Sequence, residues 1–119
     1  MKRILIIEDE PDIRESLEEM LTMHGYETHG APNGKVGFVL LSTFQPDLVI
    51  SDLMMPEMGG IDFLQSINKY RKSYPVDCIV LTAVNDKDII AKAKSIGAKH
   101  VMLKPFRLDK LLEVIKALL

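Results

Sequence analysis

The sequence predicts an α/β fold in which a parallel sheet of five strands is covered by helices on both faces. Short apolar runs recur along the 119 residues, and segments with helical apolar spacing separate them. The runs at 4–7, 48–50, 79–81 and 101–103 are apolar at every position, a pattern typical of parallel strands that are buried on both faces. Because crossovers between parallel strands are right-handed, this alternation favours an open, doubly wound sheet.

The first elements after strand 4–7 can be assigned from local patterns. Apolar residues at helical spacing between positions 13 and 21 predict a helix. We expect Asp12 to be its N-cap, with Glu15 completing a capping box, and Gly25 to end it in a left-handed conformation. Residues 26–29 alternate and are half polar, which predicts an edge strand.

Four further helices are expected along the rest of the chain. Asn33 is the predicted N-cap of the second helix, and the third follows two consecutive glycines. The fourth begins at Asn85 or Asp86 and ends at Gly97. Residues 108–118 carry the leucine-rich stripe of the fifth, so that the chain contains five strand–helix pairs.

Composition limits the classes of protein. The net charge is -2, from 15 basic and 17 acidic residues, which argues against nucleic-acid binding through a broad basic face. A lone cysteine, Cys78, excludes a disulfide framework and a cysteine zinc cluster. The apolar run at 4–7 is too short for a signal peptide or a membrane span. We therefore expect a single domain over residues 1–119, located in the cytoplasm.

Polar residues stand at the carboxyl ends of the predicted strands. Since the residue pattern does not specify a strand order, we adopt the order 2-1-3-4-5 that flavodoxin-like sheets have. In such sheets ligands bind outside the carboxyl ends of the strands, where strands one and three meet. The sequence thereby predicts a crevice that holds three carboxylates, a hydroxyl and an ammonium group. These belong to Glu8, Asp9, Asp52, Thr82 and Lys104.

Three carboxylates in one crevice repel one another unless a proton or a cation lies between them. At a separation of about 4 Å and an effective dielectric constant of about 20, two like charges repel by about 4 kcal/mol. A hard divalent ion with oxygen ligands relieves this repulsion, and Mg²⁺ takes one or two carboxylates together with water and phosphate oxygens. An aspartate beside such a site can attack a phosphoryl group to form an acyl phosphate.

Four stretches of the sequence resemble the response-regulator receiver domain of two-component signalling, including the chemotaxis receivers. They span all the polar strand ends and nearly the whole chain. They are Ile-Leu-Ile-Ile-Glu-Asp-Glu at 4–10, Asp-Leu-Met-Met-Pro-Glu-Met-Gly-Gly at 52–60, Leu-Thr-Ala at 81–83 and Lys-Pro-Phe at 104–106. The resemblance implies a flavodoxin-like, doubly wound fold with five helices.

The resemblance also implies roles for three residues at the site. Asp52 would be the phosphoacceptor. Lys104 would pair with Asp52 at rest and with the phosphoryl group afterwards, and the bond from Lys104 to Pro105 would be cis. Thr82 would move toward the phosphoryl group and donate a hydrogen bond to it.

For Mg²⁺, the resemblance implies ligation by Asp9, by Asp52 and by the backbone carbonyl of Met54. Glu8 would act through a metal-bound water. The acidic pair here is Glu8–Asp9, whereas Asp–Asp is commoner in the family. The extra methylene of Glu8 still allows it to reach a water on the metal, so we retain the metal site.

The function implied is a phosphorylation-dependent signalling switch, not a turnover enzyme, that catalyses its own phosphorylation and dephosphorylation. The phosphoryl donor would be a histidine kinase, a phosphotransfer protein or a small phosphodonor. An output domain or partner would bind the face of the fourth helix, fifth strand and fifth helix. One alternative is a metal-dependent aspartyl-phosphate phosphohydrolase, although Met54 stands where such enzymes need a second aspartate. Another is a non-phosphorylated pseudo-receiver that only binds protein.

Overall fold

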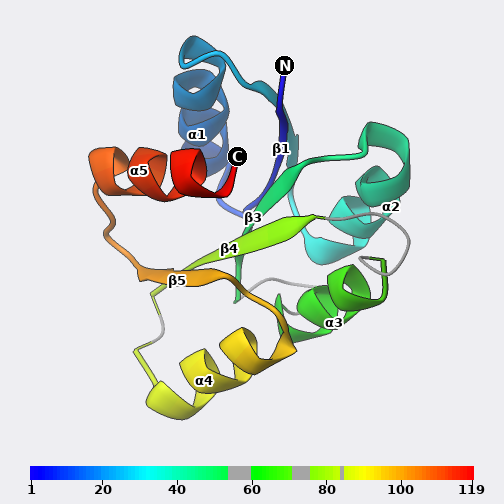
Figure 1. The fold of residues 1–119 in the computed structure, drawn as a ribbon, viewed down its shortest axis with the longest axis vertical. Helices are drawn as coiled ribbons and strands as arrows, with labels where there is room; N and C mark the ends of the chain where they lie inside the picture. The colour runs from blue at the N-terminus through cyan, green and yellow to red at the C-terminus, as the bar shows by residue number, and fades with distance from the viewer. Residues whose placement is uncertain (54–59, 71–75, 84) are drawn as a thin grey trace.

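A five-stranded parallel sheet forms the centre of the molecule, as Figure 1 shows for this computed structural model. The structure describes residues 1–53, 60–70, 76–83 and 85–119. The strand order is β2-β1-β3-β4-β5 and every neighbouring pair is parallel, which confirms the predicted topology. The strands are β1 Arg3–Ile7, β2 Glu27–Ala31, β3 Leu48–Asp52, β4 Asp77–Thr82 and β5 His100–Leu103.

Five helices cover the two faces of the sheet, again as predicted. Two of them, α1 and α5, pack on one face, and the other three cover the opposite face (Figure 1). They are α1 Pro11–Met23, α2 Gly34–Phe44, α3 Gly60–Tyr70, α4 Lys87–Ile96 and α5 Leu108–Leu118.

The central strands are buried on both sides because successive side chains point to opposite faces of the sheet. On β1, Leu5 and Ile7 pack with the core under α2, α3 and α4, whereas Ile4 and Ile6 pack with the core under α1 and α5. All four are at most 1% exposed. The lone Cys78 is buried in β4. A continuously apolar strand is therefore the correct sequence signal for this architecture.

Most predicted helix ends are confirmed by backbone geometry. Asn33 caps α2 and Asp86 caps α4, and each side-chain oxygen accepts hydrogen bonds from backbone N–H groups of the first turn. Gly25 and Gly97 have φ of 93° and 131° beyond α1 and α4, in the region that glycine adopts without a steric penalty.

The predicted start of α1 is wrong by two residues, since a cap at Asp12 would place the first helical residue at 13. The helix begins at Pro11 after an extended Glu10, so Asp12 lies in the first turn and is not the N-cap. Proline at the first helical position explains the difference, because its fixed φ suits a helix and its missing N–H needs no partner there. Asp12 still contributes a negative charge near the positive end of the helix dipole.

The edge strand extends further than predicted. It covers β2 Glu27–Ala31 and not 26–29, because it pairs with every residue of β1 from Arg3 opposite Glu27 to Ile7 opposite Ala31.

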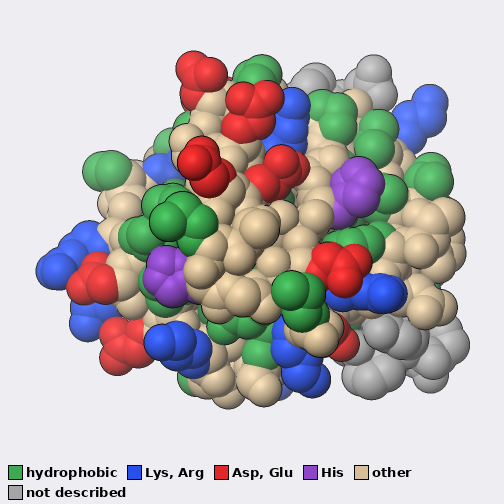
Figure 2. All heavy atoms as spheres, turned by 90° about the horizontal axis from the view of Figure 1, so that it is seen from above, with side chains coloured by type: hydrophobic (Ala, Val, Ile, Leu, Met, Phe, Trp, Pro, Cys, Tyr) green, Lys and Arg blue, Asp and Glu red, His purple; other side chains and the backbone are tan. Residues whose placement is uncertain are grey.

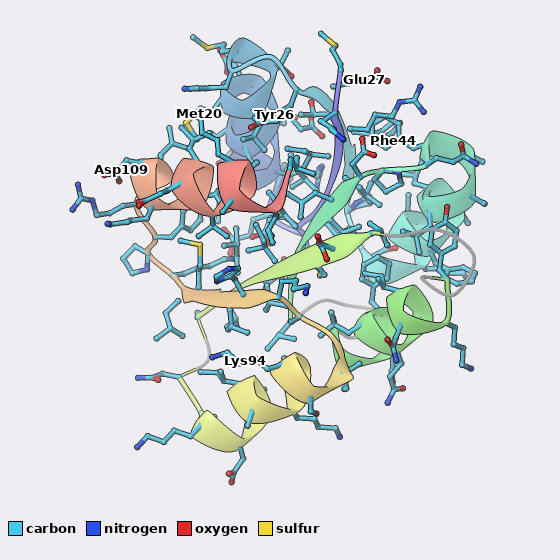
Figure 3. The ribbon with its side chains drawn as sticks, viewed as in Figure 1. Met20, Tyr26, Glu27, Phe44, Lys94 and Asp109 are labelled. Carbon is cyan, nitrogen blue, oxygen red and sulfur yellow. The ribbon has the colours of Figure 1, made fainter. Side chains whose placement is uncertain are left out.

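Arg3 makes several contacts at the end of the sheet that lies opposite the polar strand ends. Its guanidinium donates to the Phe44 carbonyl at 2.9 Å, lies over the Phe44 ring and pairs with Glu27. Figure 3 shows Glu27 and Phe44 at this end of the sheet.

Charged side chains of both signs lie on the surface of the molecule. Acidic and basic side chains are interspersed over the face that Figure 2 shows, with no continuous basic area on that face. Within the described parts of the chain, no helix is both long enough and apolar enough to cross a membrane.

Candidate functional site

The polar residues predicted at the strand ends do come together at the carboxyl edge of the sheet. Asp52 is the last residue of β3 and lies opposite Leu81 in the register with β4. Thr82 follows as the last residue of β4 and is fully buried. Lys104 comes directly after β5, and its backbone N–H donates to the Thr82 carbonyl at 2.8 Å. Parallel pairing thus aligns residues that are far apart in the sequence.

Glu8, Asp9 and Asp52 form a compact acidic cluster. One carboxylate oxygen from each lies within 4.8 Å of the others. Glu8 and Asp52 are largely buried, at 3% and 8% exposure, whereas Asp9 is exposed at the mouth of the site. Two buried carboxylates thus lie beside one that faces solvent, so the cluster reaches the surface of the molecule.

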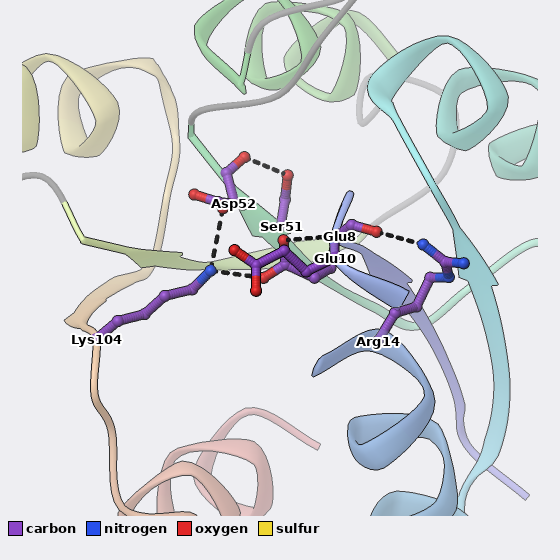
Figure 4. A network of polar contacts seen from close by, with 6 residues as sticks. All are labelled: Glu8, Glu10, Arg14, Ser51, Asp52 and Lys104. Carbon is purple, nitrogen blue, oxygen red and sulfur yellow. Dashed lines mark hydrogen bonds and ion pairs between the residues drawn. The ribbon is translucent and has the colours of Figure 1, made fainter. Parts of the chain in front are cut away.

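Lys104 places its ammonium group between the two buried carboxylates, as Figure 4 shows. Its Nζ donates to Oε1 of Glu8 at 2.5 Å and to Oδ2 of Asp52 at 3.1 Å. The side chain of Lys104 is 17% exposed. The expected pairing of Lys104 with Asp52 is confirmed, and the partner Glu8 is an addition. The peptide bond from Lys104 to Pro105 is cis, as expected.

The surroundings raise the pKa values of both Glu8 and Lys104. Burial raises the pKa of Glu8, although the hydrogen bond from Lys104 opposes this shift and the neighbouring Asp9 and Asp52 add to it. Burial by itself would lower the pKa of Lys104, but its hydrogen bonds to Glu8 and Asp52 outweigh that effect and the pKa is raised. Lys104 therefore stays charged at neutral pH and partly compensates the carboxylates.

The donor set of this cluster fits Mg²⁺. All three groups offer carboxylate oxygens, the ligands that hard divalent cations prefer, and one ammonium cannot neutralise three carboxylates. Histidine or cysteine ligands of the kind that zinc takes do not belong to the cluster. The fourth expected ligand, the carbonyl of Met54, lies outside the described residues.

Two contacts at this site were not foreseen from the sequence. The guanidinium of Arg14 on α1 donates to the backbone carbonyl of Glu8 at 2.7 Å, and the Ser51 hydroxyl donates to the Asp52 carbonyl at 3.0 Å (Figure 4). Both side chains bind backbone atoms, which neither motif spacing nor residue type reveals. The nearest sequence signal for Arg14 is its place in the first turns of the helix that follows the acidic pair.

The family model for the response regulator receiver domain matches residues 4–116. This chain belongs to the response-regulator receiver family. The sequence resemblance is thereby confirmed, and the chain is a receiver domain of two-component response regulators, a family of signalling regulators and not of classical enzymes.

Curated relatives are between 33% and 40% identical to this receiver over the aligned residues. Sporulation initiation phosphotransferase F of Bacillus subtilis is 33% identical over 115 residues, which are 97% of this chain and 91% of that protein. Transcriptional regulatory protein PdtaR of Mycobacterium tuberculosis is 40% identical over 116 residues. The chain spans 55% of PdtaR and 24% of the regulatory protein AtoC of Escherichia coli, to which it is 37% identical.

Solved structures agree with the fold throughout the chain. The chemotaxis protein CheY4 of Vibrio cholerae superposes with a TM-score of 0.92 at 26% identity, covering 100% of this chain and 99% of that one. The response regulator TrrA of Thermotoga maritima, in complex with Mg²⁺ and BeF, gives a TM-score of 0.88 at 37% identity, covering both chains completely. The acidic cluster of this receiver thus fits Mg²⁺ binding as it occurs among receiver domains.

Proposed function

We propose that this receiver is a phosphorylation-dependent switch in which Asp52 accepts a phosphoryl group from a histidine kinase or a phosphotransfer protein. The observation that carries the proposal is that Asp52 binds the Lys104 ammonium and lies within 4.8 Å of carboxylate oxygens of Glu8 and Asp9. We also infer that residues 1–119 form one receiver domain, which the single continuous sheet supports.

In the proposed step an Oδ atom of Asp52 attacks the phosphorus of the donor. A bond forms between that oxygen and phosphorus, and the bond from phosphorus to the donor nitrogen or oxygen breaks, so that the leaving group keeps the electron pair. Lys104 stays charged because its pKa is raised, and its ammonium is within reach of the oxygens that the phosphoryl group brings to Asp52. Thr82 stands at the adjacent strand end, from which its hydroxyl would donate to one of these oxygens.

Mg²⁺ would be held by Asp9 and Asp52 directly, by Glu8 through water and by the backbone carbonyl of Met54. When bound, it supplies positive charge against the phosphoryl oxygens during transfer. The chain's own contribution is to hold two carboxylates in a largely buried site while Asp9 remains open to solvent. Repulsion among the carboxylates favours a cation before any phosphoryl group arrives.

The output of the switch would be read on the face formed by α4, β5 and α5. Thr82 ends β4, and α4 begins at Lys87, so movement of the Thr82 hydroxyl toward a phosphoryl group would act on the chain that enters α4. This face also presents apolar side chains to solvent, with Ile89 on α4 37% exposed and Leu103 on β5 41% exposed. An output domain or partner protein would cover them.

The test is to incubate the protein with acetyl phosphate and to follow its intact mass with and without Mg²⁺. We expect a gain of one phosphoryl group that requires Mg²⁺ and is lost in Asp52→Asn. Asp109→Asn is the matched control, because Asp109 is an exposed aspartate that pairs with Arg107 and does not belong to the acidic cluster.

Other outcomes of this experiment would reject the proposal. Absence of the mass gain in the wild-type protein would favour a pseudo-receiver that only binds protein. Steady release of phosphate from a generic phosphate ester, with turnover, would favour a phosphohydrolase.

A further inference from the structure

The side chain of Arg14 reaches from α1 to the backbone of the acidic pair. Its Nη1 donates to the carbonyl oxygen of Glu8 at 2.7 Å (Figure 4). Arg14 is half-buried, and the carbonyl that it binds belongs to the peptide group joining Glu8 to Asp9. The bond therefore restrains the peptide group that joins the two acidic residues of this loop.

Hydrogen bonds hold the backbone before this peptide, at its carbonyl and beyond it. The Glu8 N–H donates to the Ala31 carbonyl of β2 at 3.0 Å, which continues the β1–β2 pairing by one residue. On the other side, the Arg14 guanidinium binds the Glu8 carbonyl, and the Arg14 N–H donates to the Glu10 carbonyl at 3.0 Å. Arg14 thus contacts the loop on both sides of Asp9. Asp9 itself is exposed, so burial does not restrain its carboxylate, and these contacts restrain the backbone from which it extends.

The route of the Arg14 side chain along β2 depends on a missing side chain at Gly30. A Cβ atom at Gly30 would overlap the Glu18 carboxylate and would lie 3.0 Å from Cδ of Arg14. Both side chains come from α1, and they occupy the space that any other residue at this position of the edge strand would fill. The glycine thereby lets Arg14 lie close to β2 on its way to the Glu8 carbonyl.

We propose that Arg14 is a positioning residue that holds the Glu8–Asp9 peptide so that the Asp9 carboxylate faces Asp52 in the arrangement that binds Mg²⁺. The inference rests on the proposed function, because it assumes that these carboxylates hold the metal. Arg14 touches neither the metal nor the phosphoryl group; it acts through the backbone of the loop. Partners that orient metal ligands in this way typically contribute about tenfold or more to metal affinity.

The direction in which Mg²⁺ affinity changes when Arg14 is removed distinguishes a positioning role from a purely electrostatic one. Arg14 carries a positive charge near the acidic cluster, so its removal would strengthen Mg²⁺ binding if charge alone mattered. Loss of the Glu8 carbonyl contact would instead weaken it, because Asp9 would sample orientations that do not face Asp52. A purely structural role would lower the unfolding midpoint of the metal-free protein without changing the Mg²⁺ affinity of the folded molecules.

The experiment is calorimetric titration of Arg14→Met with MgCl₂, alongside circular dichroism of the metal-free protein to establish that it is folded. We expect Mg²⁺ affinity to fall about tenfold relative to wild type. Arg107→Met is the matched control, because Arg107 is an arginine at 76% side-chain exposure, paired with Asp109, and its loss should leave Mg²⁺ affinity unchanged.

An unchanged or tighter Mg²⁺ affinity in Arg14→Met overturns the inference. If Arg14→Met does not fold, Arg14→Gln takes its place, since its shorter polar side chain also removes the bond from the guanidinium to the Glu8 carbonyl; the same loss is expected and the same result refutes it. Failure of the wild-type protein itself to bind Mg²⁺ would reject the proposed function instead, so the two failures are distinguishable.

Discussion

Replacing Lys104 by methionine should destabilise the Mg²⁺-free protein markedly at pH 7. The ammonium group binds Glu8 at 2.5 Å and Asp52 at 3.1 Å, and its removal leaves three carboxylates within 4.8 Å of one another. At that separation and an effective dielectric constant of about 20, each ionised pair repels by roughly 3 kcal/mol. Removing one partner of a buried ion pair costs about 3–5 kcal/mol. Because Lys104 keeps 17% of its side chain exposed, we expect a loss of about 3 kcal/mol.

Urea unfolding followed by far-ultraviolet circular dichroism measures this loss, since the chain has no tryptophan. The loss should shrink at saturating Mg²⁺, which supplies positive charge in place of Lys104. It should also shrink as the pH falls through the raised pKa of Glu8, because a neutral Glu8 no longer needs a cation. Lys110→Met, which breaks an exposed pair with Glu113, should cost at most about 0.5 kcal/mol. Equal stability of wild type and Lys104→Met, or a loss independent of pH and Mg²⁺, would refute the reasoning.

Three further changes should alter the stability of the folded protein in a direction that the structure defines. Burial raises the pKa of Glu8 above its unfolded value of 4.5, so the ionised form destabilises the folded protein, and the Mg²⁺-free wild type should gain stability as pH falls through the folded pKa toward 4.5. Glu8→Gln should remove that pH dependence and raise the urea midpoint at pH 7; a lower midpoint would contradict it. Asn33→Ala should cost about 1 kcal/mol in the same assay, through the lost cap of α2, and no change would show that the cap is dispensable. Gly25→Ala should cost about 1 kcal/mol because φ is 93° there, and a stabilised variant would argue against that backbone conformation.

The α/β class and the place of the site were predictable because both depend on patterns that can be read along the sequence. The apolar run of β1 marks a strand buried on both faces, and the acids that follow it mark the carboxyl edge of the sheet. Once parallel strands are aligned, Asp52 and Lys104 must lie at that same edge. The strand order itself was carried over from a known fold, since no residue pattern in the chain specifies it.

The remaining details depend on which of two neighbouring residues begins a helix and on contacts that form only in the folded chain. Asp12 is a good N-cap by residue type, but Glu10 is the N-cap and Pro11 begins the helix two residues earlier than a cap at Asp12 would. The bond from Arg14 to the Glu8 carbonyl requires the space over Gly30, and nothing in the spacing of these residues indicates it. Side chains that bind backbone atoms leave no motif, which is why such a contact appears only in the folded molecule.

The most direct measurement is the chemical location of the phosphoryl group. After phosphorylation with acetyl phosphate and Mg²⁺, borohydride reduces an aspartyl acyl phosphate to homoserine, and peptide mapping identifies the position. We predict homoserine at position 52, and none when Mg²⁺ is omitted. Homoserine at another aspartate, or an unmodified residue at position 52 in a protein that has gained a phosphoryl group, would contradict the assignment of Asp52 as the acceptor.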